Sequence, residues 1–400
     1  MSLFLCASIC LGLLSVSKVI AASAFLFRLH LPMHGLKGRI TLILPLSGRC
    51  PSLHKLIKAI GIQTLQPHKL IIAVESKNDP GYDHAQKIAT QATFPIEIII
   101  AGLTNRCAQK CWNQIAAFDR LDGLDDVIIF LDADIEPQPS WLSLLATPIL
   151  AGKADLVTGY RWHRISCNRL TQHLVAFIDR GIAILPSPAR AQLTWGGSLA
   201  LSNKTLAKLN LPVLLSSTLS DDCAIGLHAY KLGLRVLTRR LLRVPSSSYN
   251  NFTSAWNFGR RQYQIIHLYR TGLWYLALTT LTIRLCSWMM LFIGIYKFPE
   301  FMAVLLLLSL FSLSTTILQQ KIAQRLGVSD SRPARYRQLI VSLLEPLITL
   351  IHWSMIAAAS YTKIVRWGHV SYKINKNDDI EVLTRTPWKK GNCNEEKETL

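Results

Sequence analysis

An apolar run that ends in two aspartates constrains this chain more than any other feature. Residues 127–131 (Val-Ile-Ile-Phe-Leu) are followed directly by Asp132-Ala133-Asp134. Such a run predicts a strand buried on both faces. Because strand residues alternate sides, both carboxylates are expected together at the carboxyl end of the strand, where open α/β sheets bind ligands. They predict an oxygen site for Mg²⁺ or Mn²⁺, with a solvated strand end as the alternative.

The residues around this run predict the rest of an α/β domain. Apolar runs at 40–45, 70–74, 96–100 and 154–160 alternate with segments of helical spacing, which indicates a parallel sheet. Glu75 and Asp79 follow the second run, at the edge where Asp132 is expected. The pair Gly196-Gly197 indicates either close approach of the backbone to a ligand or an ordinary turn. Asp221-Asp222 open a helix, as functional carboxylates or as simple caps.

Hydrophobic residues make up 50% of the chain and charged residues 17%, which favours a membrane protein over a disordered one. Apolar segments of spanning length lie at 3–27, 273–297, 300–318 and 338–361. The formal net charge is +20. Its concentration between 231 and 270, just before an apolar segment, favours contact with anionic lipid and a cytoplasmic catalytic domain. No basic-aromatic strand platform supports the alternative of nucleic-acid binding.

These patterns divide the chain into four parts. Residues 1–30 are expected to be a membrane anchor, 38–270 the catalytic domain, 271–365 membrane helices and 366–400 a polar cytoplasmic tail that is flexible from Lys373 onward.

The order of these motifs resembles a known family. Leu131-Asp132-Ala133-Asp134, the Gly197 segment, Asp221-Asp222 and Arg260-Arg261-Gln262-Tyr263 follow one another as in family 2 glycosyltransferases with the GT-A fold. Within that family, the acidic loop 74–80 and the segment 366–372 are most similar to ceramide glucosyltransferases and their hopanoid-linked bacterial relatives. The resemblance covers about residues 38–270 and the membrane segments.

The resemblance implies a role for each of these residues. Glu75 and Asp79 would face the uridine of a UDP-sugar, Asp132 the ribose or sugar, and Asp134, with Asp132, the metal ion. Asp222 would be the general base, with Asp221 beside it. The remaining substrate-binding residues would be Gly196, Gly197, Arg260, Arg261, Gln262 and Tyr263. Arg260 and Arg261 would hold the diphosphate, but the Trp that follows the arginine in the family's Gln/Arg-x-x-Arg-Trp element is absent here, where Gln262 and Tyr263 follow instead.

The residue types suit this chemistry by themselves, because a diphosphate leaving group needs cationic stabilisation and a hydroxyl acceptor needs a base. We therefore expect an inverting, metal-assisted transfer of a hexose from a UDP-sugar to a lipid hydroxyl, such as that of ceramide. The alternatives are a processive polysaccharide synthase, whose channel needs more spanning helices, and a catalytically silent membrane scaffold.

Overall fold

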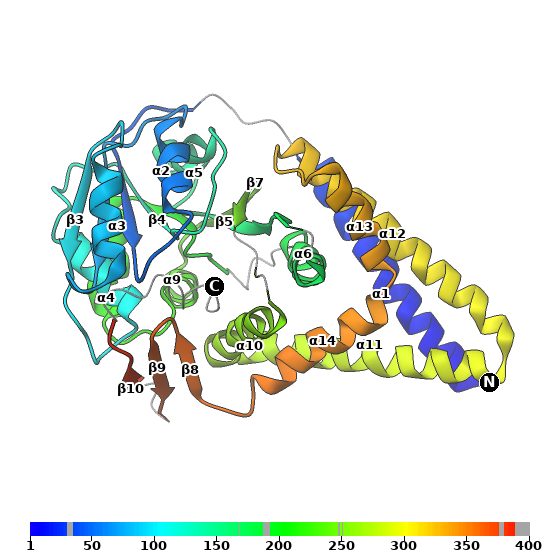
Figure 1. The fold of residues 1–400 in the computed structure, drawn as a ribbon. Helices are drawn as coiled ribbons and strands as arrows, with labels where there is room; N and C mark the ends of the chain where they lie inside the picture. Colours follow the sequence, from blue (N-terminus) through cyan, green and yellow to red (C-terminus); the bar gives the residue numbers. More distant parts are fainter. Residues whose placement is uncertain are drawn as a thin grey trace.

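The computed structural model describes residues 1–29, 35–167, 169–186, 193–246, 249, 251–375 and 380–388. The described chain has a globular part and a group of long helices that projects from it (Figure 1). The globular part is built on a seven-stranded sheet with the strand order β3-β2-β1-β4-β6-β5-β7. The strands are β1 (Ile40–Pro45), β2 (Lys69–Val74), β3 (Ile96–Ile100), β4 (Val127–Leu131), β5 (Leu156–His163), β6 (Ser198–Leu201) and β7 (Val236–Ser246).

The predicted α/β fold class is confirmed, with one difference in strand direction. β1 pairs in parallel with β2 and β4, and β2 pairs in parallel with β3. β6, however, runs antiparallel to both β4 and β5. The chain turns at Gly196-Gly197 directly before β6, and it enters the sheet from the end at which β4 finishes. The sheet is therefore mixed rather than wholly parallel.

Helices cover both faces of the sheet. One face packs against α2 (Leu53–Gly61), α3 (Pro80–Ala89) and α5 (Trp141–Leu150). The other packs against α4 (Gln109–Phe118), α8 (Leu211–Leu215) and α9 (Asp221–Lys231), with α7 (Asn203–Leu209) beside them. β4 is fully buried along its length, as its unbroken apolar sequence predicts. This fixes the position of the two aspartates that follow it.

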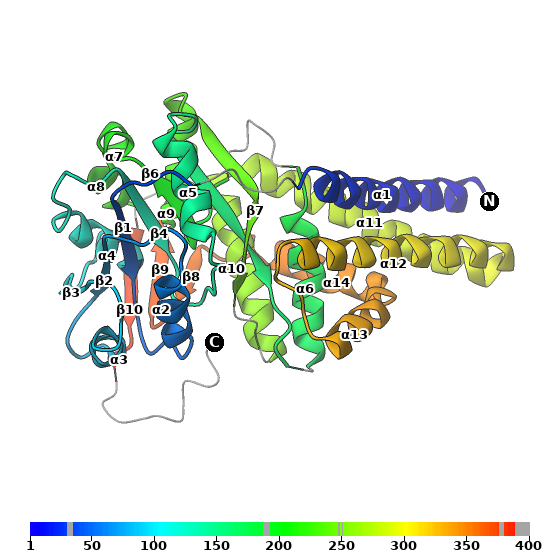
Figure 2. The ribbon, with the colours of Figure 1, turned by 90° about the horizontal axis from the view of Figure 1, so that it is seen from above.

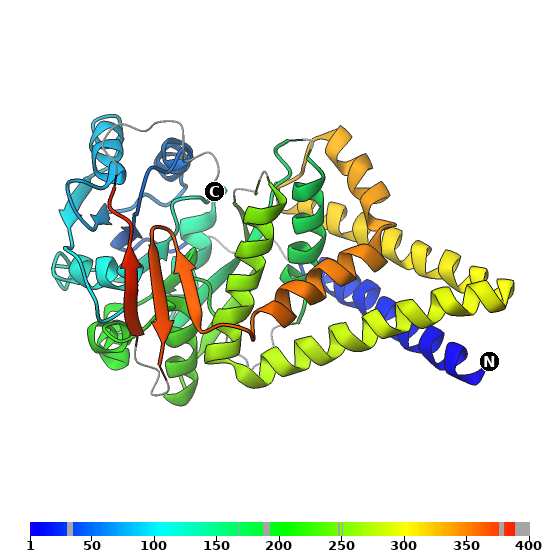
Figure 3. The same cartoon turned by 60° about the horizontal axis from the view of Figure 1, so that its bottom comes forward.

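Residues beyond the apolar helices form a second sheet, although the chain from Lys373 onward was expected to be flexible. β8 (Ile364–Trp367), β9 (Val370–Ile374) and β10 (Ile380–Arg385) pair in antiparallel order. Val365, Val370 and Tyr372 are buried in the same core cluster as α4 and α9. Their alternation with exposed residues is the period-two pattern of a sheet with one buried face. Figure 3 shows this sheet lying across the catalytic domain.

Three described helices are long and apolar enough to cross a membrane. They are α1 (Ser2–Phe27), α11 (Thr271–Lys297) and the segment Pro299–Arg325, which joins the short helix η1 (Pro299–Phe301) to α12 (Met302–Arg325). They project together from one side of the globular part (Figure 2). The fourth apolar segment is bent by 84° between α13 (Arg332–Ser342) and α14 (Glu345–Ala358). Glu345, at this bend, pairs with Lys18 of α1 and Arg284 of α11.

Two elements connect the projecting helices to the catalytic sheet. Helix α6 (Leu170–Ala183) contacts both β5 and α13, and its Arg180 forms a buried ion pair of 2.7 Å with Asp330. Helix α10 (Phe252–Tyr269) contacts α9 on one side and α14 on the other, and leads through Arg270 directly into α11. The catalytic edge of the sheet is thus held next to the apolar helices.

The arginines of β7 lie against protein, although the charge pattern predicted a lipid contact. Arg235, which directly precedes β7, forms an ion pair with Asp155. Within β7, Arg239 donates a hydrogen bond to the carbonyl of Leu144, and Arg243 donates to that of Ala183. These groups stabilise the domain because each finds an acceptor within it.

Candidate active site

Lys110 joins the two aspartate motifs into one site. Its Nζ lies 2.9 Å from an oxygen of Asp132, at the end of β4, and 3.2 Å from an oxygen of Asp221, at the start of α9. These carboxylates and that of Asp222 raise the pKa of Lys110 well above its usual value, although burial acts in the opposite direction. The motifs that the sequence placed at one edge of the sheet therefore lie together there.

The two aspartates of α9 have different environments. Asp221 is 1% exposed; one of its oxygens accepts a hydrogen bond of 2.6 Å from Gln114, and the other has no hydrogen-bond partner among the described residues. Asp222 is partly exposed, and it accepts hydrogen bonds from the Ser220 hydroxyl and the backbone N–H of Gly196. Burial and the neighbouring charge of Asp221 raise the pKa of Asp222. A partly exposed carboxylate with a raised pKa can accept a proton from a bound acceptor.

The Gly196-Gly197 pair is in close contact with these carboxylates. A Cβ at Gly196 would lie 2.9 Å from both Asp221 Oδ2 and Lys110 Nζ. A Cβ at Gly197 would lie 2.3 Å from the ring of Trp195 and 2.9 Å from Asp132 Oδ2. All of these distances are shorter than the contacts that real Cβ atoms make. The glycines therefore give the backbone the close approach that the sequence suggested.

Asp134 lies in a more cationic part of the site. Burial and the charge of Asp132 raise the pKa of Asp134 to about 6, against the opposing effect of Arg161. Arg161 is held by Asp179 of α6 at 2.9 Å, and its guanidinium lies 4.5 Å from the ring centre of Phe258. Arg261 stacks on the rings of Phe258 and Trp367, and the charge of Asp134 is among those that act on it. Two arginines thus face the side of the site that holds Asp134.

The other residues of the Arg260–Tyr263 motif lie differently. Arg260 lies over the ring of Trp256, whose indole N–H donates to Ser354 of α14. Tyr263 is buried against Met355 and Ile356, and its hydroxyl contacts His352. Gln262 is partly exposed. Of the predicted set, Arg261 packs on Trp367, whose ring also lies next to Lys110, and Tyr263 is directed to the contact with α14. Trp256, which was not predicted, also contacts α14.

Glu75 and Asp79 lie at the carboxyl ends of β1 and β2 and are both buried. Asp79 caps α3 by accepting hydrogen bonds from the backbone N–H groups of Gly48 (2.8 Å) and Gly81 (2.7 Å). Its other oxygen is buried with no hydrogen-bond partner among the described residues, and burial raises its pKa to about 6. Glu75 is bonded to residues of the C-terminal sheet, described below.

The carboxylates of Asp132 and Asp134 fit a divalent ion that takes most of its ligands from a bound substrate. No group of three or more His, Cys, Asp or Glu side chains within the described ranges is arranged to hold a metal by itself. Burial and the charge of Asp132 both raise the pKa of Asp134, and a cation bound by the two carboxylates would offset both effects. Ions such as Mg²⁺ are commonly bound by one or two carboxylates together with substrate phosphates.

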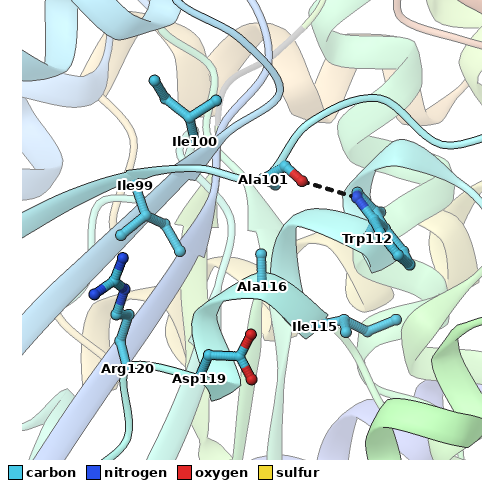
Figure 4. A pocket seen from close by; sticks show the side chains of 8 residues that line it. All are labelled: Ile99, Ile100, Ala101, Trp112, Ile115, Ala116, Asp119 and Arg120. Carbon is cyan, nitrogen blue, oxygen red and sulfur yellow. Dashed lines mark hydrogen bonds between the residues drawn. The ribbon is translucent and has the colours of Figure 1, made fainter.

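A separate hollow of about 400 Å³ lies at the outer edge of the sheet, between the end of β3 and α4. Figure 4 shows Trp112 on one side of it, donating a hydrogen bond of 2.9 Å to the carbonyl of Ala101. β3 is the edge strand, and two strands separate it from β4. The hollow therefore does not belong to the carboxylate site.

Sequence reasoning missed Lys110, Gln114, Arg161 and Trp367. Lys110 and Gln114 have the spacing of one helix face, i and i+4, which was a usable signal. Arg161 lies in a strand whose end faces the same edge as β4, but a lone arginine in a strand gives no sign of its role. Trp367 reaches the site only through the C-terminal sheet; the resemblance noted the segment 366–372 but implied no site role for this residue.

Comparison with known proteins agrees with this geometry. Residues 41–200 match the family described as Glycosyl transferase family 2, so the chain carries a glycosyltransferase domain, and the predicted enzyme class is confirmed. No curated protein matches the chain. Among solved structures, a mannosyltransferase from Pyrobaculum calidifontis, in complex with GDP-Man and Mn²⁺, is 13% identical, with 89% of this chain and 97% of that chain covered and a TM-score of 0.47. Glucosyl-3-phosphoglycerate synthase from Mycobacterium tuberculosis is 17% identical, with 57% and 77% covered and a TM-score of 0.37.

Proposed function

We propose that this protein is a membrane-bound glycosyltransferase that moves a hexose from a UDP-sugar to the hydroxyl of a lipid such as ceramide. The observation that carries the proposal is the contact of Lys110 with both Asp132 and Asp221. This contact joins the motif that would bind the sugar donor to the motif that would supply the general base. The match of residues 41–200 to family 2 glycosyltransferases supports the reaction class.

The donor would lie along the carboxyl ends of β1, β2 and β4. Glu75 and Asp79 would lie beside the nucleotide base, and Asp132 and Asp134 would lie beside the diphosphate. Mg²⁺ or Mn²⁺, held by Asp134 and Asp132, would supply positive charge to the leaving diphosphate. Arg261 and Lys110 would add charge-assisted hydrogen bonds to the same group, which stabilises the charge that develops as the sugar leaves.

The acceptor hydroxyl would be activated by Asp222. The N–H of Gly196 and the hydroxyl of Ser220 orient its carboxylate, and its raised pKa makes it a stronger base than an ordinary aspartate. Asp221, buried and bonded to Gln114, is better placed to hold Lys110 than to meet a substrate. One base and direct displacement predict inversion at the sugar carbon.

The membrane side of the site supports a lipid acceptor. Helix α10, which carries Arg261, continues into the apolar helix α11 and packs against α14. An acceptor with its chains among these helices would present its hydroxyl at the edge of the site. The catalytic domain would face the cytoplasm, where nucleotide-sugars are made.

The experiment is to incubate the purified protein with labelled UDP-sugars and total lipid extract, followed by mass spectrometry of the lipids. Wild type should yield a lipid with one added hexose. Asp222→Asn should lose transfer but keep Mn²⁺-dependent UDP binding, whereas Asp134→Ala should lose both. A polymeric product would favour a polysaccharide synthase, and transfer that persists in Asp222→Asn would refute the role of the base.

A further inference from the structure

The C-terminal sheet is a fixed part of the catalytic domain. Val365, Val370 and Tyr372 are each 2% exposed or less, in the core they share with α4. The Tyr372 hydroxyl accepts a hydrogen bond of 3.0 Å from the backbone N–H of Gln109 at the start of α4. Side chains that point from this sheet toward the catalytic edge are therefore held in place as firmly as those of the domain itself.

Three of these side chains converge on Glu75. Arg385, at the end of β10, donates a hydrogen bond of 2.9 Å to one oxygen of the carboxylate. The other oxygen accepts a hydrogen bond of 2.6 Å from the indole N–H of Trp388 and lies 3.0 Å from Nε2 of His369. Burial acts to raise the pKa of Glu75, but these three partners lower it below its usual value, which keeps the group ionised.

Trp388 makes the contacts that a nucleotide base would make at this position. Its flat ring packs on His369, with ring centres 4.2 Å apart, while its N–H bonds Glu75. Its edge also lies against Gly48, beyond β1, where a Cβ would come within 3.1 Å of the ring. The two rings are tilted by 42° to each other. A planar ring that packs on His369 and donates one N–H to a carboxylate describes an indole and a pyrimidine equally well.

The surrounding groups carry hydrogen-bonding capacity that the indole does not use. The side chain of His369 is 9% exposed; its Nε2 faces Glu75, and its Nδ1 has no hydrogen-bond partner among the described residues. Arg385 is fixed by a second hydrogen bond of 2.9 Å to the carbonyl of Thr104. Glu75 is thus a buried acceptor with a potential donor on each side of it. Buried polar groups without partners are costly, so this arrangement favours a ligand with more polar atoms than an indole.

We propose, on the basis of the donor site described above, that the C-terminal sheet reads the base of the nucleotide, and that Trp388 occupies the base position until a nucleotide displaces it. Glu75 would accept an N–H of the base, while Arg385 and His369 would donate to the carbonyls on either side. Uracil presents this edge, an N–H between two carbonyls. Guanine presents one carbonyl followed by two donors, which leaves one of the two flanking donors unmatched. His369 and Arg385 are therefore specificity-determining residues for UDP over GDP.

Calorimetric titration of the full-length protein with UDP and GDP, in the presence of Mn²⁺, tests whether the C-terminal sheet recognises the nucleotide base. Wild type should bind UDP at least about fivefold more tightly than GDP, since an unmatched buried group costs about 1 kcal/mol or more. Arg385→Gln should reduce this ratio by at least about fivefold. Arg366→Gln, which removes the same charge from an exposed position on β8, is the matched control and should leave the ratio unchanged.

Trp388→Phe tests the displacement. Phenylalanine keeps a flat ring but cannot donate a hydrogen bond to Glu75. The side chain at position 388 then competes less well with the nucleotide base, and UDP should bind at least about fivefold more tightly. Trp388 lies beyond β10, so this variant is expected to melt as wild type does, and it remains informative if Arg385→Gln unfolds. Equal binding of UDP and GDP by wild type would overturn the base reading. Weaker UDP binding by Trp388→Phe would overturn the displacement, because the indole would then belong to the bound state. Absence of any nucleotide binding in wild type would instead refute the proposed function.

Discussion

Replacing Lys110 by Met tests the contact that unites the two aspartate motifs. Methionine is similar in length to lysine but carries no charge, so the substitution removes the ammonium from between Asp132 and Asp221 while largely keeping the packing. The expected result is a loss of stability in the catalytic domain, because Asp221 is 1% exposed and would keep only Gln114 as a partner.

The magnitude follows from the distances. At 2.9 and 3.2 Å, each ion pair is worth about 5 kcal/mol for an effective dielectric constant of about 20, before the cost of burying the charges is subtracted. Removing one partner of a buried pair typically costs about 3–5 kcal/mol. The side chain of Asp132 is 30% exposed, so solvent screens its share, and the lower end of this range, about 3 kcal/mol, is expected. For a domain of this size that corresponds to a melting temperature lower by about 6–12 °C.

Thermal melting in detergent, followed by tryptophan fluorescence, measures this loss. Lys87→Met, at an exposed position of α3, is the control for removal of a lysine charge and should change little. Adding Asp221→Asn to Lys110→Met should recover part of the loss, because the amide is neutral and still accepts the hydrogen bond from Gln114. The reasoning is refuted if Lys110→Met melts within about 2 °C of wild type, or if the second substitution lowers the melting temperature further.

Two other predictions use the glycine pair and the cap of α3. Gly196→Ala should reduce sugar transfer about 100-fold, because its Cβ displaces Asp221 and Lys110. Gly181→Ala, where a Cβ meets no atom within 4 Å, is the control, and equal activity of the two variants would contradict the assignment. The pKa of Asp79 is raised to about 6 in the folded protein. Between about pH 4 and pH 6 the folded protein therefore keeps a proton that the unfolded chain has already released. The wild type accordingly loses about 3 kcal/mol of stability as the pH rises through this window. Asp79→Asn keeps the acceptor for Gly48 and Gly81 without this loss, so its melting temperature should rise relative to wild type between pH 4 and pH 8, and a constant difference would argue against a raised pKa.

Local patterns in the sequence were sufficient for much of the domain. The buried run of β4 placed Asp132 and Asp134, because a strand with apolar residues at every position has both faces covered and must end where the polar residues begin. The same reasoning placed Glu75 after β2 and predicted the close approach at Gly196-Gly197. These features depend on residues that are neighbours in the chain.

Contacts between distant residues were beyond this reasoning. The antiparallel entry of β6 depends on which strands it meets, and its four residues do not specify a direction. Residues 366–400 were assigned to a polar tail, flexible from Lys373 onward, because their charges obscure the alternation of buried positions in β8 and β9. The roles of Lys110 and Arg161 arise only when the chain has brought carboxylates from other elements next to them.

The position of the C-terminal sheet in the shared core has a consequence for biogenesis. A ribosome produces β8 to β10 only after α1, α11, α12 and α14 have been synthesised, so one side of the catalytic core stays uncovered while these apolar helices emerge. A nascent chain that stalls before Val365 lacks the apolar cover over α4 as well as the partners of Glu75. Folding of the catalytic core is therefore completed only after the apolar helices have been synthesised, which delays catalysis until the chain is nearly finished.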